Sequence, residues 1–310
     1  MARSYPLYKR LGSRGSNLAL TQSRLVQQAL RVCYPDMKID IEPIATTGDK
    51  IQDRTLIELG GKGLFVKEIE EALLEKRIDF AVHSLKDMPP DLPEGLIIGA
   101  ILKREDPRDV LIAPKFGTFD RLPKGCVLGT ASLRRQAQIK MLRPDILVEP
   151  LRGNVETRIQ KIKEGHAAAT ILAMAGLKRL GLEEWIKGVF SCDDMLPAVG
   201  QGALCVECRA DDDEMLNLLA KLDHFPSRIA IIAERACLRV LEGSCRTPIA
   251  AYGICEENHI HLRALIAKSD GSVFFRTQQS APLEEAEQLG RLVGEELRAQ
   301  GGPGFFAIET

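Results

Sequence analysis

Short apolar runs alternate with helical patterns through the first two thirds of the chain. "IDIEPIA" (39–45), "VKEIEEALLEK" (66–76) and "FAVHSL" (80–85) make one strand–helix–strand alternation. Three further apolar runs, each followed by a helix-like segment, lie at 126–130, 145–151 and 167–173. Such alternation is typical of a mostly parallel sheet covered by helices. This part of the chain therefore predicts two doubly wound α/β domains.

The pattern changes after about residue 222. One apolar face recurs at a three-and-four spacing from Ile229 to Val240, and three strand-like runs follow it. The last two runs are joined across Asp270-Gly271, which is a hairpin signal. A final amphipathic helix follows Pro282, a residue that suits a first helical turn. These signals predict a small α+β domain with a three-stranded antiparallel sheet.

Two loops rich in charge, proline and glycine are the predicted crossings between domains. They are "KREDPRD" (103–109) and "LPAVGQGA" (196–203). We predict a first domain from 1–102 with 203–221, a second from 103–202 and a third from 222–310.

Composition narrows the class of protein. The 310 residues are 45% hydrophobic, enough to bury substantial cores. An aromatic content of 5% and a net charge of −1 argue against a nucleic-acid-binding protein. Eight irregularly placed cysteines indicate reduced thiols. The start "MARSYPLYKR" is too short and polar for a secretion signal, and no run of about 18 apolar residues occurs, so we expect a cytoplasmic location.

Charged and hydroxyl side chains follow the ends of the predicted strands. Ligands of open α/β sheets collect at this edge, where helix N-termini point their N–H groups. An exposed ion pair alone contributes about 0 to 1 kcal/mol, so any one of these charges could be a solvated surface group. Their repeated placement predicts a polyanion site, because guanidinium groups bind carboxylates and phosphates bidentately. The side chains are Arg14, Ser16, Lys86, Asp87, Ser132, Arg134, Arg135, Arg152 and Arg158.

Asp87 is an acid among these bases, and two interpretations stay open. It is an ion-pair partner of Lys86 or of a neighbouring arginine, or it stabilises positive charge that develops on a substrate. Fixed charges in the second role commonly contribute about 3 to 4 kcal/mol to lowering a barrier.

The glycine-punctuated segment 46–65 ends in "GGKGLF" before a helix. No Gly-Lys-Ser/Thr follows at the spacing of a phosphate-binding loop, so the segment predicts a lid. Lys62 and Phe65 are its candidate ligand-facing residues, although Phe65 equally suits the core.

Cysteines and histidines give weaker signals. Cys245, in the short loop of "LEGSCRTPIA", is either a small filler residue or a functional thiol. Cys205 and Cys208 form a lone Cys-x-x-Cys in a strand-like run, and His259 and His261 alternate along another. We assign both pairs to structure and predict no metal site.

Taken together, these segments resemble the hydroxymethylbilane synthase family, also called porphobilinogen deaminases, nearly end to end. "HSLKDMP" together with the distant "LEGSC" is the most specific part of the resemblance. The resemblance implies three domains, of which the first two resemble periplasmic binding proteins and the third carries the cysteine. The other matching segments are "GSRGSNLAL", "TTGDK", "GGKGLFVKEIEEALL", "REDPRD", "GTASLRRQAQ", "LRGNVETR", "ILAMAGLKRLGL" and "LPAVGQGAL".

The resemblance also implies an activity, a transferase step of tetrapyrrole biosynthesis. Four porphobilinogen units are joined head to tail with loss of ammonia, and water then releases hydroxymethylbilane. The growing chain is tethered to a dipyrromethane cofactor, which a thioether holds on Cys245. The family further implies a monomer with porphobilinogen as its partner and a hand-over of product to uroporphyrinogen III synthase, without nucleic acid or membrane.

Roles for the strand-end residues follow from the same resemblance. The pyrrole acetates and propionates need cationic partners, and Asp87, with Lys86, is the implied catalytic group that stabilises the cationic azafulvene. The implied cofactor-binding residues are Cys245, Lys86, Asp87, Ser132, Arg134, Arg135 and Arg152. The implied substrate-binding residues are Arg14, Ser16, Lys62, Phe65, Arg158, Arg179 and Gln201.

Three positions depart from the pattern of some relatives: Ala131 stands where relatives often have a serine, Ser244 where a glycine is commoner, and Thr47 where some, but not all, have an arginine. None of them affects Asp87 or Cys245. Two rival functions remain. A solute-binding module needs two α/β lobes around an anion but no Asp87, and a cysteine transferase using a thioester at Cys245 usually needs a nearby histidine, which "LEGSCRTPIA" lacks.

Overall fold

A computed structural model describes residues 7–50, 65–242 and 247–305. These residues fold into two compact units. The first unit is Met1–Arg104 with Ala203–Arg228, and the second is Glu105–Gly202 with Ile229–Thr310.

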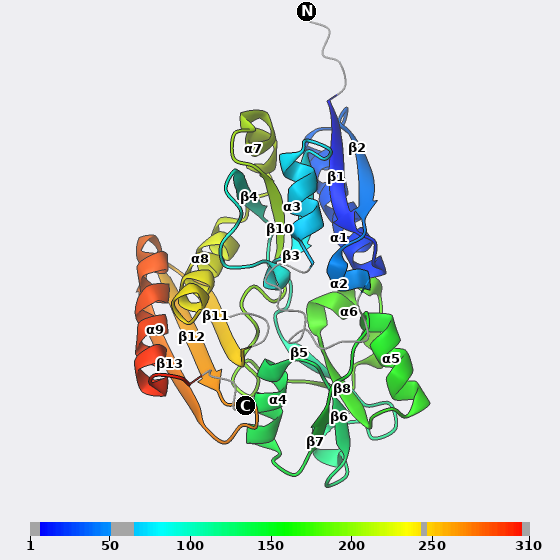
Figure 1. Cartoon of the computed structure of the whole chain (residues 1–310), viewed down its shortest axis with the longest axis vertical. Helices are drawn as coiled ribbons and strands as arrows, with labels where there is room; N and C mark the ends of the chain where they lie inside the picture. Colours follow the sequence, from blue (N-terminus) through cyan, green and yellow to red (C-terminus); the bar gives the residue numbers. More distant parts are fainter. Residues whose placement is uncertain (1–6, 51–64, 243–246, 306–310) are drawn as a thin grey trace, which may run out of the picture. The chain divides into compact units, whose positions relative to one another are not determined.

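The first unit is built on a five-stranded sheet with the order β2-β1-β3-β10-β4 (Figure 1). β1 pairs in parallel with β2 and with β3, whereas β10 runs antiparallel between β3 and β4. The sheet is therefore mostly parallel with one reversed strand. The strands are β1 (Tyr8–Arg14), β2 (Lys38–Ile44), β3 (Phe80–Ser84), β4 (Leu96–Ile101) and β10 (Leu204–Arg209).

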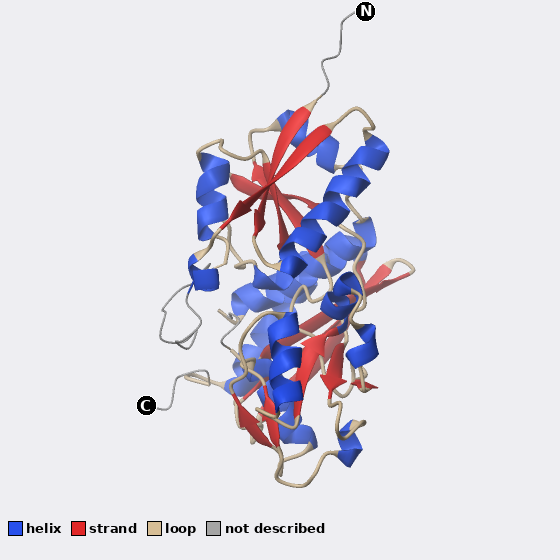
Figure 2. Ribbon diagram, turned by 90° about the vertical axis from the view of Figure 1, so that its right-hand side faces the viewer, coloured by secondary structure: helices blue, strands red, loops and turns tan. Residues whose placement is uncertain are grey.

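Helices lie on both sides of the strands of this sheet (Figure 2). α1 (Asn17–Cys33) and α7 (Asp213–Leu219) pack on one face, where Val26, Leu30, Met215 and Leu219 join the strand residues Leu11, Phe80 and Val206 in one core. α3 (Lys67–Leu74) packs on the other face through Ile69 and Leu73, against Ala81. Two short elements complete the unit, α2 (Thr47–Lys50) and η1 (Leu85–Asp87).

The second unit holds a similar sheet with the order β7-β6-β8-β5-β9. β6 pairs in parallel with β7 and β8, and β5 is the reversed strand between β8 and β9. Its strands are β5 (Asp109–Ile112), β6 (Val127–Gly129), β7 (Leu147–Glu149), β8 (Ala169–Ala173) and β9 (Gly188–Val189). Its helices are α4 (Leu133–Leu142), α5 (Val155–Glu164) and α6 (Met174–Leu180), with short turns η2 (Phe119–Arg121) and η3 (Glu183–Trp185).

The second unit also contains an antiparallel sheet of three strands, β11 (Ile249–Glu256), β12 (His259–Ala267) and β13 (Phe274–Pro282). The helices α8 (Phe225–Val240) and α9 (Ala286–Gly301) share one apolar core with this sheet (Figure 1). The two helices approach closely at Gly290, where an added Cβ would lie 2.2 Å from the carbonyl oxygen of Ala233. Only glycine fits this crossing without displacing backbone.

The structure confirms the predicted fold class of two helix-covered α/β sheets and a small three-stranded antiparallel sheet. The hairpin at Asp270-Gly271 is present, with Gly271 at a φ of +74°. Pro282 does not lie in the first turn of α9. It ends β13, and η4 (Leu283–Glu285) separates it from the helix.

The three-domain division with boundaries at 102, 202 and 221 stays a prediction, since the second unit holds both a mixed and an antiparallel sheet. Within the described residues, no helix is both long and apolar enough to cross a membrane.

Candidate functional site

A pocket of the first unit lies where β1 and β3 end. Its lining includes Arg14, Ser16, Phe65, His83 and Asp87. Four of these five residues are predicted site residues, and they come from three separate segments of the chain. The carboxyl edge of the parallel strands therefore gathers them, as the strand-end argument predicts.

The α1 side of the pocket favours an anion. Ser16 is the N-cap of α1, and its Oγ accepts a hydrogen bond of 3.3 Å from the amide of Ala19. No acidic residue occupies the first turn of this helix, so the positive end of its dipole is not neutralised. The guanidinium carbon of Arg14 lies 4.2 Å from the centroid of the Phe65 ring, within the range of a cation–π interaction. Phe65 is therefore part of the pocket.

Asp87 ends the 3-10 turn η1, directly after β3. The turn is fixed at its base, because the amide of Leu85 donates to the carbonyl of Ala203 at 3.1 Å and Gln22 Nε2 donates to Ser84 Oγ at 2.9 Å. The Asp87 side chain is exposed, and the structure assigns its carboxylate no hydrogen bond or ion pair with another described residue. An ion pair to Lys86 is thus not found in the described part of the chain.

A second group of charges lies at the base of this pocket. His83 Nε2 is 3.0 Å from Glu207 Oε2, and both side chains are buried. Glu70 of α3 is also buried, and its carboxyl interacts with both of these residues. Burial and, next, the negative charge of Glu207 raise the pKa of Glu70 to about 7, although His83 acts in the opposite direction.

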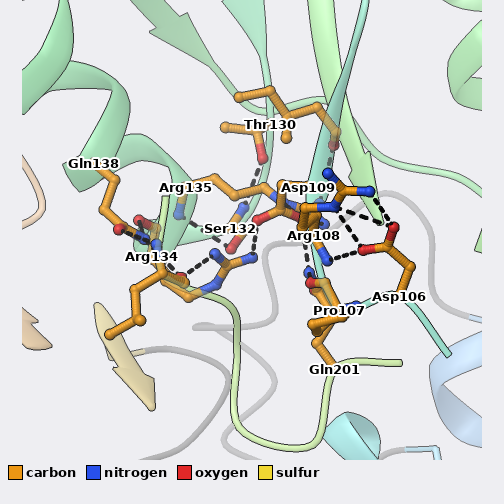
Figure 3. A network of polar contacts seen from close by, with 12 residues as sticks. Asp106, Pro107, Arg108, Asp109, Thr130, Ser132, Arg134, Arg135, Gln138 and Gln201 are labelled. Atoms are coloured by element: carbon orange, nitrogen blue, oxygen red, sulfur yellow. Dashed lines mark hydrogen bonds and ion pairs between the residues drawn. The ribbon is translucent and has the colours of Figure 1, made fainter. Parts of the chain in front are cut away.

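In the second unit, Asp109 is the centre of a polar network at the start of β5 (Figure 3). Its Oδ2 lies 2.7 Å from Arg134 Nη2, and its Oδ1 accepts from Arg135 Nη2 at 2.7 Å and Nε at 3.1 Å. All three side chains are buried. Burial alone would raise the pKa of Asp109, but the two guanidinium groups outweigh that effect and hold the pKa well below its usual range.

Neighbouring groups complete the network. Gln201 Nε2 donates to Asp109 Oδ1 at 3.0 Å and to the carbonyl of Pro107 at 2.7 Å. Ser132 is the N-cap of α4, and its Oγ accepts from the amide of Arg135 at 3.4 Å. Figure 3 shows both arginine side chains reaching from α4 toward Asp109. The helix that bears the arginines is thus capped by another predicted site residue.

The remaining predicted arginines lie in other parts of the second unit. Arg179 Nη2 donates to the carbonyl of Gly202 at 2.7 Å, next to Gln201, and burial lowers the pKa of Arg179 to about 10. Arg158 Nε donates to the carbonyl of Gly153 at 2.7 Å, at the start of α5. Arg152 precedes the same helix and is half-buried.

Two predicted site residues, Lys62 and Cys245, lie outside the described residues. Four buried charged residues were missed: Glu70, His83, Asp109 and Glu207. Glu70 lies in a segment that predicts a helix, and His83 and Glu207 lie in strand-like runs. Asp109 lies at the end of a predicted domain crossing. The available signal was a charged side chain inside or directly beside an apolar run, as in "FAVHSL", "RDVLIA" and "ALCVEC".

No group of three or more His, Cys, Asp or Glu residues suited to a metal ion occurs among the residues the structure describes. Cys205 and Cys208 are buried in β10. The pocket and the Asp109 network contain guanidinium and hydroxyl donors, which suit an organic anion.

The fold and these two sites define an α/β protein in which arginine and hydroxyl side chains gather at strand ends, beside the exposed carboxylate of Asp87. Sequence comparison gives the family. The model "Porphobilinogen deaminase, dipyromethane cofactor binding domain" matches residues 10–217, and "Porphobilinogen deaminase, C-terminal domain" matches residues 228–299. The chain belongs to the porphobilinogen deaminase family.

Curated relatives agree with this assignment. The porphobilinogen deaminase of Brevibacillus brevis is 50% identical over 299 residues, 96% of this chain and 96% of that protein. The chloroplastic porphobilinogen deaminase of Oryza sativa subsp. japonica is 47% identical over 304 residues, 96% of this chain and 85% of that protein. Among solved structures, the periplasmic VFT2 domain of Bordetella pertussis BvgS is 12% identical, with a TM-score of 0.41 over 70% of this chain and 86% of that chain.

Proposed function

We propose that this chain joins four porphobilinogen molecules head to tail with loss of ammonia and releases hydroxymethylbilane by hydrolysis. The observation that carries the proposal is the strand-end pocket. It places the exposed carboxylate of Asp87 in one lining with a cation, Arg14, and an aromatic ring, Phe65. A pyrrole that carries acetate and propionate groups needs all three partners, since it combines an N–H donor, a flat ring and two anions.

The same donor set fits a dipyrromethane cofactor, which has the same pyrrole rings and carboxylates. When bound, this cofactor supplies the primer ring onto which the substrate units are added, and we propose that a thioether on Cys245 holds it. Arg134 and Arg135 also donate to the carbonyls of Leu196 and Ile171 and are buried, so we propose that a ligand carboxylate binds at the edge of the Asp109 network. The residues proposed to hold the cofactor are Lys86, Asp87, Ser132, Arg134, Arg135, Arg152 and Cys245.

Asp87 is the proposed catalytic residue. As the aminomethyl C–N bond of porphobilinogen breaks and ammonia leaves, positive charge develops toward the pyrrole nitrogen. A carboxylate that accepts the pyrrole N–H stabilises this charge. When the new C–C bond forms, a ring proton must leave, and the Asp87 carboxylate is a base placed in the pocket for this transfer. Lys86, its neighbour in η1, is proposed to pair with a substrate carboxylate.

The remaining predicted residues are proposed to bind the substrate carboxylates and ring. Arg14 and the helix N-terminus at Ser16 bind one carboxylate, and Phe65 stacks on the incoming ring. The full proposed set is Arg14, Ser16, Lys62, Phe65, Arg158, Arg179 and Gln201.

Intact mass and turnover test the proposal together. The purified protein is expected to exceed its sequence mass by two porphobilinogen units less their ammonia, and a Cys245→Ser variant is expected to lack the excess. The protein with the excess mass should convert porphobilinogen to hydroxymethylbilane and ammonia. If the apoprotein offered porphobilinogen gains no mass and forms no product, the solute-binding alternative replaces the proposal.

We further propose that a monomer carries out the reaction and hands its product to uroporphyrinogen III synthase. Sedimentation at working concentration and a coupled assay with that synthase test these two points. The cytoplasmic location stays a prediction.

A further inference from the structure

His83 and Glu207 make a close contact between buried side chains on neighbouring strands. Cys205 lies opposite His83 and Glu207 lies opposite Ala81 in the antiparallel register of β10 and β3. His83 and Glu207 are therefore diagonal neighbours on one face of the sheet. Their side chains are 3% and 0% exposed. No donor among the described residues forms a hydrogen bond with either oxygen of Glu207, and the 3.0 Å approach of His83 Nε2 to Oε2 is the contact that joins the two side chains.

A second acid, Glu70 of α3, is also buried, and it lies near enough to both residues for their charges to act on its pKa. Two carboxylate charges are costly to bury close together, so Glu70 tends to retain its proton, which limits the repulsion. The pKa of Glu70, raised to about 7 by burial and by Glu207, is consistent with this reasoning.

The other charges around this cluster are engaged elsewhere. Arg209, two residues after Glu207 on β10, donates to the carbonyls of Leu73 and Ile78 and pairs with Asp212 at 2.8 Å and with Asp79 at 3.8 Å. Glu71, beside Glu70 on α3, is exposed and lies 3.9 Å from Lys67. On the pocket side, the charged groups are Arg14 and Asp87. His83 is therefore the basic side chain that the structure places against the two buried acids.

The pair lies four residues before Asp87 in one continuous segment. Three successive residues of this segment are each held from a different element: His83 by Glu207 of β10, Ser84 by Gln22 of α1, and Leu85 by Ala203. The first of these three contacts joins two buried side chains. The turn η1, which carries Asp87, begins at Leu85, two residues after His83.

We propose that His83, held by Glu207 and faced by Glu70, is a positioning residue that fixes the end of β3 and with it the Asp87 carboxylate in the pocket. This inference rests on the proposed function, because it takes Asp87 as the reacting group. Neither His83 nor Glu207 needs to contact porphobilinogen for this role.

The first test compares Glu207→Gln with Glu71→Gln, a matched loss of an exposed acid. In the cofactor-loaded enzyme, Glu207→Gln is expected to lower kcat at least tenfold while KM for porphobilinogen changes less than threefold. Glu71→Gln should leave both values within twofold. The imidazole NMR signals of His83 in the substrate-free protein should shift in Glu207→Gln and not in Glu71→Gln.

A second variant, Glu70→Gln, keeps the His83–Glu207 pair and removes only the group that titrates. Its glutamine resembles the protonated Glu70 of the wild type. The kcat of the variant should therefore equal the wild-type kcat at pH 6 and exceed the wild-type kcat at least twofold at pH 8.5. This variant keeps the test decisive if Glu207→Gln does not fold.

The outcomes separate the two proposals. An inactive, cofactor-loaded wild type would overturn both the proposed function and the positioning role. An active wild type together with a folded Glu207→Gln of unchanged kcat would overturn the positioning role alone. A Glu70→Gln to wild-type kcat ratio that stays constant from pH 6 to 8.5 would also overturn it.

Discussion

The Asp109 network and the His83 cluster are both buried charge groups at strand ends, yet their compositions are opposite. In the second unit one carboxylate lies between two guanidinium groups. In the first unit one imidazole lies among two carboxyl groups. The pKa of Asp109 is accordingly held below its usual range, whereas the pKa of Glu70 rises to about 7.

The difference shows how each unit suits a different task. An excess of guanidinium groups gives a site net positive charge and a fork of N–H donors, the chemistry that recognises carboxylates. Where carboxyl groups are in excess, one of them, Glu70, keeps its proton up to a pH of about 7. The first composition is suited to binding carboxylates, and the second to holding a strand end in a way that depends on pH.

The largest expected effect comes from removing the shared acid of the second unit. Asp109→Asn leaves two buried guanidinium groups without a counter-charge and should lower the free energy of unfolding by about 3 to 5 kcal/mol. Urea denaturation at pH 7 measures this loss. Asp106→Asn, which removes the carboxylate paired with the exposed side chain of Arg108, is the control and should cost about 0 to 1 kcal/mol. Equal losses in the two variants would contradict the central role of Asp109.

The pH dependence of the same variant sharpens the comparison. The native pKa of Asp109 lies below its ordinary value, so its contribution to stability is complete above that ordinary value and is lost as the pH falls through the native pKa. The stability difference between wild type and Asp109→Asn should therefore shrink in acid.

Asp87 belongs to neither cluster, and its removal separates chemistry from stability. Asp87→Ala should lower kcat about 100- to 1000-fold, because the developing positive charge loses its fixed partner. The free energy of unfolding should stay within about 0.5 kcal/mol, as expected for an exposed side chain. Turnover and urea denaturation of the same preparation check both statements. A variant that keeps full activity would refute the catalytic assignment.

Glu70 gives the corresponding test in the first unit, but its contribution to stability is lost as the pH rises rather than as the pH falls. Its native pKa of about 7 exceeds the ordinary 4.5, so unfolded chains release this proton first and stability falls as the pH rises between those values. At 1.36 kcal/mol for each pKa step, the loss is about 3 kcal/mol and is complete above pH 7. Glu70→Gln should not show this loss. Parallel stability curves for the two proteins between pH 5 and 8 would contradict the assignment.

The sequence predicted the strand ends well, because a strand end is a local feature. Arg14, Ser16 and Asp87 follow apolar runs whose length and flanks indicate strands, and parallel strands bring such residues to one edge. Phe65 was predicted as a lid residue or a core residue, and only its contact with Arg14 places it in the pocket.

The buried charge clusters were not predicted, because they depend on pairing between distant segments. Glu207 lies in "ALCVEC", a run whose two cysteines were considered as a Cys-x-x-Cys pair. Its partner His83 is on another strand, β3. The reversed strands β5 and β10 bring Asp109 and Glu207 to their partners. The alternation of strands and helices does not show which strand is inserted between two others.

The smallest effect concerns the cap of the helix that bears Arg134 and Arg135. Ser132→Ala removes the N-cap hydroxyl of α4 and should lower the free energy of unfolding by about 1 kcal/mol. Asn154→Ala removes the N-cap of α5, where Oδ1 accepts from the amide of Thr157 at 2.8 Å, and should cost a similar amount. If Ser132 also contacts a ligand carboxylate, only Ser132→Ala should raise KM for porphobilinogen, by about two- to tenfold for one lost hydrogen bond. Equal KM values in the two variants would restrict Ser132 to capping, and the ligand-binding part of the Asp109 network would then consist of its guanidinium groups.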